Sequence, residues 1–302
     1  MEIITGTTDF YLEKETAVAI GKFDGVHIGH RRLLEEILGQ KAGGLTACVF
    51  TFEPAPSVLF GQSDGKVLTT REEKRLLFER MGVDILIEFP LNLETAAIAP
   101  EVFVSEILAK RMNARLIAAG SDLSFGAGGK GNTAILESFG SEFGYKVKTI
   151  EKVRFEEKEV SSTYIRSQVE AGSMELAEKL LGTAYPVMGR VAHGNRIGRT
   201  LGFPTVNLLP EGEKLLPPNG VYDSLVRYKG REYRAVSNVG YKPTVAQERI
   251  LGVESYLYDF HLDIYGEFIE IYLLKFRRPE RKFEDLEALK RQLQEDIAGA
   301  KL

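Results

Sequence analysis

Residues 19–34 read AIGKFDGVHIGHRRLL, and this stretch decides the fold of the first half of the chain. An apolar run comes first, Gly21, Gly25 and Gly29 permit a tight loop, and His27 and His30 lead into an amphipathic helix. A strand, a glycine-rich turn and a helix in this order predict one βα unit.

The same pattern recurs as far as about Val153. Short apolar runs alternate with amphipathic stretches: AVAI before HRRLLEEIL, TACVFTF before REEKRLLFERM, DILIEF before EVFVSEILAKRM, and RLIAAG before a glycine-rich loop. This alternation predicts a Rossmann-like α/β domain with a parallel sheet. The connections place a ligand site at the carboxyl ends of the strands, where the Gly21 loop and residues 51–56 and 120–131 converge.

The pattern changes after MELAEKLLG, a predicted helix that ends at Gly182. Tyr185-Pro186 marks a boundary, so we place one domain at residues 1–183 and another at residues 184–302. The second half has short strands with turn signals, including Lys229-Gly230, which predict a small antiparallel β-barrel. A C-terminal helix packed on this barrel is predicted from apolar residues at helical spacing: Phe283, Leu286, Leu289, Leu293 and Ile297.

The composition excludes several classes of protein. The 302 residues are 44% hydrophobic, enough for two cores, and 39 Lys and Arg against 43 Asp and Glu give a net charge of -4. We therefore expect no surface for nucleic acid or membranes. The single cysteine, Cys48, lies in the apolar run ACVFTF and is expected to be buried. A single cysteine fits a reducing, cytoplasmic setting. The sequence shows no signal peptide and no apolar run of about 18 residues, so no membrane span is expected.

The turn before the first helix has the composition of a phosphate clamp. Backbone N–H groups at a helix start favour anions, and His27 and His30 can both face the oxygens of a leaving pyrophosphate. The alternative, a glycine-rich turn with two incidental histidines, is disfavoured by the strand-turn-helix context. Zinc binding is also disfavoured, because the chain has one Cys and four His and no third ligand shows suitable spacing.

A second string, VSSTYIRSQVEAG, places Ser161, Ser162 and Thr163, and then Arg166, ahead of a predicted amphipathic helix. Hydroxyl groups and a guanidinium suit polyphosphate oxygens. Plain capping of the helix is the alternative interpretation.

Together the HIGH and SSTYIR motifs resemble the nucleotidylyltransferase superfamily. GKFDGVHIGH and TFEPAP are similar to the N-terminal domain of bacterial bifunctional riboflavin kinase/FAD synthetases. The resemblance implies that FMN attacks the α-phosphate of ATP in line, with release of pyrophosphate and with Mg²⁺ offsetting the charge. It implies three groups of residues: His27, His30, Ser162, Thr163 and Arg166 at the phosphates; Gly21, Phe23, Asp24, Gly25 and Gly29 at ATP; and Phe52, Pro54, Asp122 and Phe125 at FMN.

Two positions depart from this family's pattern. Ala55 in TFEPAP stands where the family usually has histidine, and Ser124 in GSDLSFG stands where an arginine is common. If those side chains assist binding, we expect weaker adenylylation or a different arrangement of FMN. The segment SFGAGGKGN is predicted to be either a substrate loop or a surface loop.

The second half has no P-loop and no protein-kinase signature, so phosphoryl transfer there needs other machinery. The candidate is GRVAHGNRIGRTLGFPTVNL, which contains Gly189, Gly198, three arginines, Thr205 and Asn207. Because alternate residues of an extended segment face one side, Thr205 and Asn207 could share one hard cation that carries ATP phosphates. A solvated barrel loop is the alternative.

This half resembles the riboflavin kinase domain nearly end to end, through GRTLGFPTVNL, NGVYDSLV, SNVGYKPTV, GVESYLYDF and FRRPERKFEDLEAL. The resemblance implies that Thr205 and Asn207 are ligands of Mg²⁺ and phosphate. It implies that Glu254 is the base for the ribityl 5′-hydroxyl, although an exposed strand residue is the alternative. Arg278 and Glu280 align with the segment near the flavin, and a surface ion pair would also explain them.

Matching motifs in the same order, from about residue 15 to residue 300, predict a bifunctional enzyme that makes FMN from riboflavin and FAD from FMN. Its expected ligands are riboflavin, FMN, FAD, ATP, ADP and pyrophosphate, with Mg²⁺ as cofactor, and its oligomeric state stays open. One alternative is a nucleotidylyltransferase for another phosphate, such as phosphopantetheine or nicotinate mononucleotide, which leaves the second half unused. The other is a non-catalytic flavin- or ATP-binding regulator, which is disfavoured because the catalytic residue types are retained.

Overall fold

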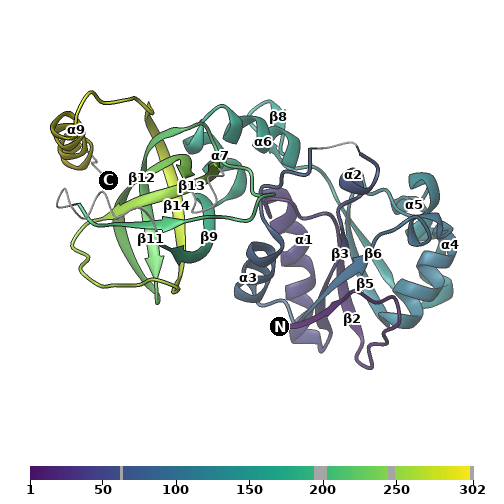
Figure 1. The fold of residues 1–302 in the computed structure, drawn as a ribbon. Coiled ribbons are helices and arrows are strands. Elements are labelled where there is room, and N and C mark those ends of the chain that lie inside the picture. The colour runs from purple at the N-terminus through teal and green to yellow at the C-terminus, as the bar shows by residue number, and fades with distance from the viewer. Residues whose placement is uncertain (62–63, 194–202, 244–248, 300–302) are drawn as a thin grey trace. The chain divides into compact units, whose positions relative to one another are not determined.

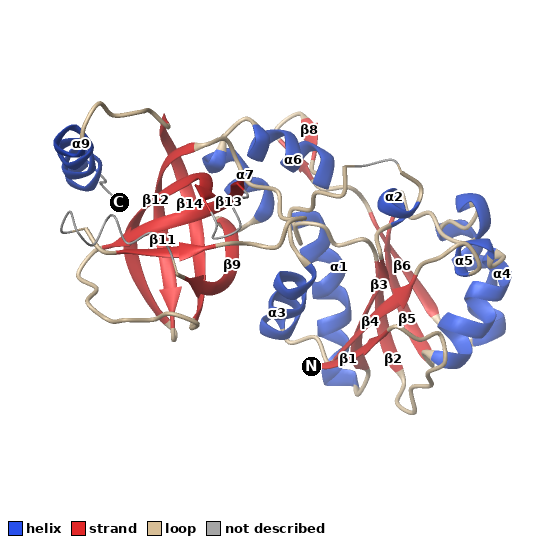
Figure 2. Cartoon of the chain, viewed as in Figure 1, coloured by secondary structure: helices blue, strands red, loops and turns tan. Residues whose placement is uncertain are grey.

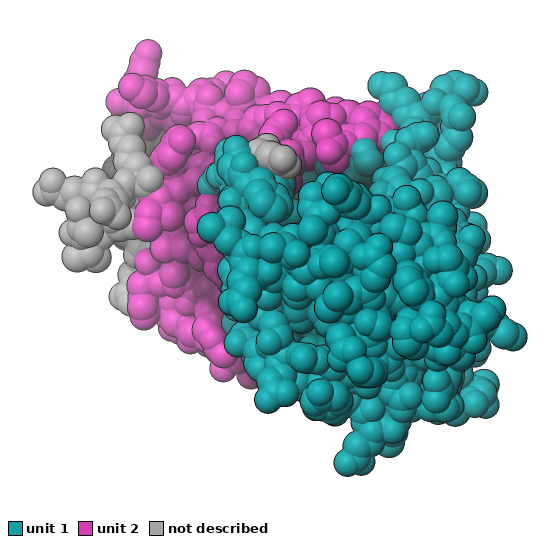
Figure 3. Space-filling view, turned by 90° about the vertical axis from the view of Figure 1, so that its right-hand side faces the viewer, with its two compact units in different colours: residues 1–162 teal, residues 163–302 magenta. Residues whose placement is uncertain are grey.

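The computed structural model describes residues 1–61, 64–193, 203–243 and 249–299. The chain forms two compact units, Met1–Ser162 and Thr163–Leu302 (Figure 3). The border lies before helix α7 (Met174–Leu181), whereas the sequence pattern places it after that helix. The functional division into residues 1–183 and 184–302 therefore stays a prediction. None of the helices in these described ranges is both long and apolar enough to cross a membrane.

A six-stranded parallel sheet forms the middle of the first unit (Figures 1 and 2). Its spatial order is β1 (Glu2–Thr5), β4 (Ile85–Pro90), β3 (Thr46–Glu53), β2 (Thr16–Ile20), β5 (Ala114–Gly120) and β6 (Lys146–Ile150). The predicted parallel sheet is confirmed, and the two edge strands β1 and β6 are additions to it. Cys48 is buried in β3 as predicted, and burial raises the pKa of its thiol.

Helices cover both faces of this sheet (Figure 1). On one face, α1 (Ile28–Gly39) and α3 (Arg71–Met81) bury apolar side chains such as Leu34 and Phe78. On the other, the π-helix η3 (Phe103–Arg111) and α5 (Thr133–Phe143) bury Phe103 and Leu136. The remaining short elements are η1 (Gln40–Gly43), α2 (Pro56–Leu59), η2 (Thr95–Ala97), α4 (Pro100–Val102), η4 (Ala127–Gly129), β7 (Arg154–Phe155) and β8 (Lys158–Glu159).

The strand order reverses between β2 and β5. Strands β3 and β4 extend the sheet on one side of β2, whereas β5 and β6 extend it on the other. In parallel sheets a reversal of this kind opens a crevice at the carboxyl ends of the two strands, and ligands bind there. Residues 21–27 follow β2 and residues 121–131 follow β5, so two of the predicted loops lie at this switch point.

The second unit contains a closed antiparallel barrel, as predicted. Its order is β10 (Thr205–Leu208), β13 (Arg249–Leu257), β12 (Arg231–Pro243), β11 (Gly220–Tyr228), β14 (Phe268–Pro279) and β9 (Tyr185–Ala192), which closes on β10. Lys229 and Gly230, with φ of 48° and 77°, make the predicted hairpin between β11 and β12. Helices α6 (Ser162–Glu170), α7 and the predicted C-terminal helix α9 (Leu286–Gly299) complete the fold, although the side chains of Leu286 and Leu289 lie outside the described residues.

Three fully buried serines cross the barrel interior from strand to strand. The hydroxyl oxygens of Ser224 and Ser237 are 2.7 Å apart, and those of Ser237 and Ser255 are 2.6 Å apart. We call these residues the hydroxyl row. Because successive side chains of a strand point to opposite faces, the neighbours Asn238 and Glu254 lie on the outer face of the barrel.

Candidate active sites

The first candidate site begins at residues 21–27, which we call the histidine turn. Phe23, Gly25 and Val26 have φ values of 52°, 86° and 43°, in the left-handed region. Only glycine adopts this region without cost, so the surrounding structure must stabilise the other two residues. Gly21 is also constrained, because a Cβ there would lie 3.1 Å from the ring of Phe23.

A neighbouring segment holds this turn. The Gly25 N–H donates to Thr69 Oγ1 at 3.0 Å, and Asp24 Oδ1 accepts from the N–H groups of Leu68 and Thr69 at 2.7 and 3.2 Å. Ser162 Oγ donates to the carbonyl oxygen of Asp24 at 2.8 Å. The structure therefore gives Asp24 and Ser162 a part in shaping the turn, and their contacts with ATP stay predictions.

His27 and His30 come together at the start of α1. Their rings stack with centroids 3.6 Å apart, and His27 Nδ1 accepts the backbone N–H of His30 at 3.3 Å. This bond leaves the proton of a neutral His27 on Nε2. A Cβ at Gly29 would lie 3.1 Å from the His27 ring, so glycine at that position lets the His27 ring lie against the backbone of residue 29.

Both imidazoles are neutral near pH 7. Burial lowers the pKa of His27 to about 4, against the opposing effect of the Asp122 carboxylate. Burial, the His27 ring and the Lys74 ammonium lower the pKa of His30 well below its usual value. Each neutral ring offers one N–H donor, and such preorganised donors stabilise charge that develops on phosphate oxygens.

The residues predicted at FMN have different environments. Phe125 is 3% exposed and packs on Phe103 with ring centroids 5.2 Å apart, while Phe52 lies 6.3 Å from the same ring. Pro54 follows a cis peptide bond, and Asp122 is exposed and pairs with Lys152 at 3.4 Å. The two rings therefore have packing roles in the aromatic core, and the contacts of all four residues with FMN stay predictions.

The two departures from the family pattern lie in loops. Ala55 precedes α2 and makes no side-chain cap. Ser124 Oγ donates to the carbonyl oxygen of Gly129 at 3.0 Å, and Gly126 and Gly128 have φ of 68° and 63°. The conformation of this glycine-rich loop thus depends on the positive φ of Gly126 and Gly128 and on the hydrogen bond from the Ser124 hydroxyl. Thr163 and Arg166 belong to the second unit, so their role at the polyphosphate stays a prediction.

The second candidate site lies on the outer face of the barrel. Glu254 of β13 pairs in register with Asn207 of β10 on one side and with Asn238 of β12 on the other. We call these three residues the outer row. Thr205 Oγ1 donates to Glu254 Oε1 at 2.6 Å. The structure therefore brings together the predicted Thr205, Asn207 and Glu254, and adds Asn238 of the SNVGYKPTV string, to which the sequence assigns no role.

These groups fit a hard cation. A hydroxyl, an amide and a carboxylate supply oxygen donors, the type that Mg²⁺ prefers, and Thr205 Oγ1 keeps its lone pairs while it donates its proton to Glu254. The glycines predicted beside them are less informative. Gly189 lies within β9, paired with Ile269, and is therefore a strand residue and not part of a loop. Gly198 lies outside the described residues, as do Arg196 and Arg199.

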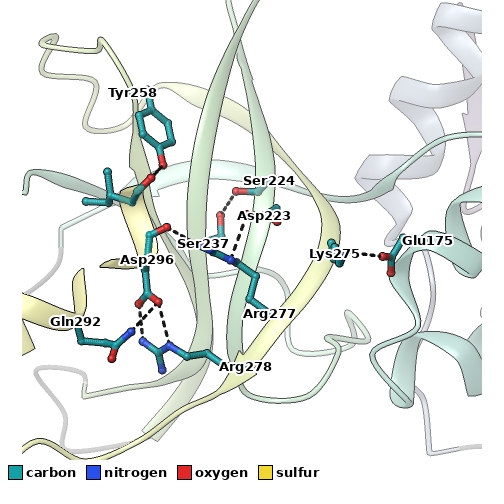
Figure 4. Close-up of polar contacts among 11 residues, drawn as sticks. Glu175, Asp223, Ser224, Ser237, Tyr258, Lys275, Arg277, Arg278, Gln292 and Asp296 are labelled. Carbon is teal, nitrogen blue, oxygen red and sulfur yellow. Dashed lines mark hydrogen bonds and ion pairs between the residues drawn. The ribbon is translucent and has the colours of Figure 1, made fainter. Parts of the chain in front are cut away.

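Arg278 and Glu280 make contacts within the unit. Arg278 forms a forked ion pair with Asp296 of α9, at 3.0 and 2.5 Å, and Gln292 donates to the same carboxylate (Figure 4). Glu280 accepts from the side-chain amides of Asn238 and Asn219 at 3.0 and 3.3 Å. Glu280 thus hydrogen-bonds to Asn238 of the outer row, whereas the Arg278 guanidinium forms an ion pair with the C-terminal helix. Their contacts with flavin stay predictions.

Comparison with known proteins covers both units. A FAD synthetase family model matches residues 11–164, and a riboflavin kinase family model matches residues 181–302. The chain is 36%, 34% and 36% identical to bifunctional riboflavin kinase/FMN adenylyltransferases of Listeria monocytogenes, Bacillus subtilis and Escherichia coli. These alignments cover 96%, 98% and 94% of this chain and 93%, 96% and 91% of those proteins.

A crystal structure described as a macrolide-efflux protein from Streptococcus pneumoniae is also similar, with a TM-score of 0.85 and 30% identity. The match covers 99% of this chain and 97% of that one. One family model thus matches the first half of the chain and the other the second half, and the relatives align along nearly all of it. The chain belongs to the bifunctional riboflavin kinase/FMN adenylyltransferase family, whose members produce FMN and FAD.

Proposed function

We propose that each half of the chain carries one of the two reactions. The histidine turn serves adenylylation of FMN by ATP, with release of pyrophosphate, in residues 1–183. The outer row serves phosphorylation of riboflavin by ATP in residues 184–302. A cytoplasmic location is proposed as well, since both reactions consume ATP.

In the kinase, Glu254 is the proposed general base. Its carboxylate accepts the proton of the ribityl 5′-hydroxyl as that oxygen attacks the γ-phosphate of ATP, whose bond to the β–γ bridging oxygen breaks to release ADP. Thr205 orients this carboxylate through their 2.6 Å hydrogen bond. Thr205 and Asn207 would hold Mg²⁺, which offsets phosphate charge when it is bound.

In the adenylyltransferase, positioning and charge stabilisation are proposed to suffice. The phosphate of FMN attacks the α-phosphate of ATP, and pyrophosphate leaves without a covalent enzyme intermediate. His27 and His30 donate N–H groups to the phosphate oxygens on which charge accumulates. Thr163 and Arg166 are proposed to contribute further donors to the same phosphates.

The observation that carries this proposal is the meeting of Thr205, Asn207 and Glu254. The sequence places Glu254 far from the other two, yet strand pairing sets it opposite Asn207 and within 2.6 Å of the Thr205 hydroxyl. The hydrogen bond from Thr205 and the pairing with Asn207 favour a functional role for Glu254 over the alternative of an exposed strand residue without one.

The test is a time course of purified protein with riboflavin, ATP and Mg²⁺, with flavins separated by chromatography. We expect FMN to appear before FAD, and we expect neither product when EDTA replaces Mg²⁺. FMN without FAD would leave only the kinase assignment and point to Ala55 and Ser124. Undiminished rates in EDTA would contradict the metal assignment.

A further inference from the structure

We propose that Thr69 is a positioning residue for adenylyl transfer, acting on the histidine turn through the N–H of Gly25. Thr69 is 2% exposed, and its Oγ1 accepts that N–H at 3.0 Å. It belongs to neither the HIGH motif nor the SSTYIR motif. The inference rests on the proposed role of the histidine turn.

The turn needs external support. Phe23 and Val26 are not glycines, yet both have positive φ, which is a strained conformation for residues with side chains. Such a conformation persists only where the surroundings determine it. Thr69 supplies support at the centre of the turn, at Gly25, between these two residues.

The supporting segment is itself rigid. Thr70 Oγ1 accepts the N–H of Glu73, and the Glu73 carboxylate accepts the N–H of Thr70, which together form a capping box at the start of α3. One residue later, Arg71 pairs with the buried carboxylate of Glu88 in β4 at 2.5 Å. Thr69 therefore connects the histidine turn to a helix that is anchored on the sheet.

The consequence for catalysis follows from the order of residues. Val26 directly precedes His27, and His27 begins α1 while its ring stacks on His30. A turn that relaxes at Gly25 would therefore displace the two imidazoles relative to the phosphates. Displacements of about 1 Å can reduce rates by about 100-fold, even when they arise far from the chemistry.

The experiment compares three variants. Thr69→Val keeps the shape but removes the acceptor, Thr69→Ser keeps the hydroxyl, and Thr70→Val removes the neighbouring cap without touching Gly25. Adenylylation of supplied FMN is measured at saturating ATP and FMN. Phosphorylation of riboflavin by the same preparation is the internal control for the second unit, and thermal unfolding followed by circular dichroism shows whether the first unit, which contains Thr69, is folded.

We expect Thr69→Val to lower kcat for adenylylation by about tenfold or more, with KM for FMN and the kinase rate changed by less than about twofold. Thr69→Ser should restore most of kcat. Thr70→Val should lower the unfolding temperature, because α3 loses its N-terminal cap, while keeping the adenylylation rate. If Thr69→Val does not fold, Thr69→Ala, which also lacks the acceptor, replaces it in the same comparison.

An adenylylation kcat in Thr69→Val equal to that of the wild type would overturn the inference. An equal loss of kcat in Thr70→Val would also overturn it, because the effect would then be one of stability alone. A wild-type protein that phosphorylates riboflavin without adenylylating FMN would instead contradict the proposed role of the histidine turn. The two failures are therefore distinguishable.

Discussion

Replacing Glu88 with glutamine should destabilise the first unit substantially. The Glu88 side chain is 3% exposed and accepts from Arg75 at 2.8 and 2.6 Å and from Arg71 at 2.8 and 2.5 Å. Burial raises the pKa of this carboxyl, but the hydrogen bonds from Arg75 and Arg71 outweigh burial and lower it to about 2, from 4.5. The ionised form is therefore strongly favoured in the folded state.

The magnitude follows from that pKa. A difference of this size corresponds to about 3 kcal/mol of stability near pH 7, and truncating one partner of a buried ion pair typically costs about 3–5 kcal/mol. Because the folded pKa is lower than the unfolded pKa, the contribution is fully present above pH 4.5 and disappears as the pH falls towards 2. At pH 3 about half of it should remain.

The assay is urea unfolding followed by circular dichroism at pH 7 and at pH 3. We expect Glu88→Gln to lower the free energy of unfolding by about 3 kcal/mol at pH 7 and by about half as much at pH 3. Glu79→Gln is the matched control, since Glu79 is exposed and its carboxylate lies 3.4 Å from the N-terminal ammonium. It should cost less than about 1 kcal/mol.

A difference between Glu88→Gln and wild type that is equal at the two pH values would refute the titration argument. A loss no larger than that of the control would refute the claim that the buried carboxylate stabilises the unit.

Two further predictions concern the sites and the C-terminal helix. Glu254→Ala should lower riboflavin phosphorylation by about 10²–10⁴-fold while sparing adenylylation of supplied FMN, and His30→Ala should do the reverse; loss of both activities in either folded variant would contradict two separate sites. Asp296→Asn should lower the stability of the second unit by about 2 kcal/mol in thermal or urea unfolding, because Arg278 loses its charged acceptor. Asp285→Asn keeps a capping oxygen for the same helix and should change little, so equal losses in the two variants would contradict this account.

The central strands could be predicted from the sequence because they are buried on both faces. TAVAI and ILIEFP are apolar except for Thr16 and Glu88, and every residue of β2 is buried. The sequence does not predict the edge strands β1 and β6, since EIIT is largely exposed, KVKTI is at most half-buried, and both carry charged residues. Their place in the sheet comes from pairing with β4 and β5, which no local pattern encodes.

The sites divide in the same way. His27 and His30 could be identified because they are three residues apart at a glycine-rich turn. Thr69 could not, since it approaches the turn from 44 residues away. Asn238 lies in the SNVGYKPTV string, but its place beside Glu254 follows only from strand register. The family resemblance alone predicts Phe125 at FMN. Its burial beside Phe103 depends on tertiary packing, which the sequence does not reveal.

The hydroxyl row inside the barrel has a consequence for how this chain can vary. The hydroxyls of Ser224, Ser237 and Ser255 hydrogen-bond to one another across adjacent strands. Replacing one serine by an apolar residue would therefore leave a buried hydroxyl on the next strand without that hydrogen bond. A slip of β12 against β13 would break the same chain, and it would move Asn238 away from Glu254. An evolutionary change to an all-apolar barrel interior would thus have to replace all three serines together. A sequence that lost only one of them would weaken the register of the strands that places the Glu254 carboxylate on the outer face.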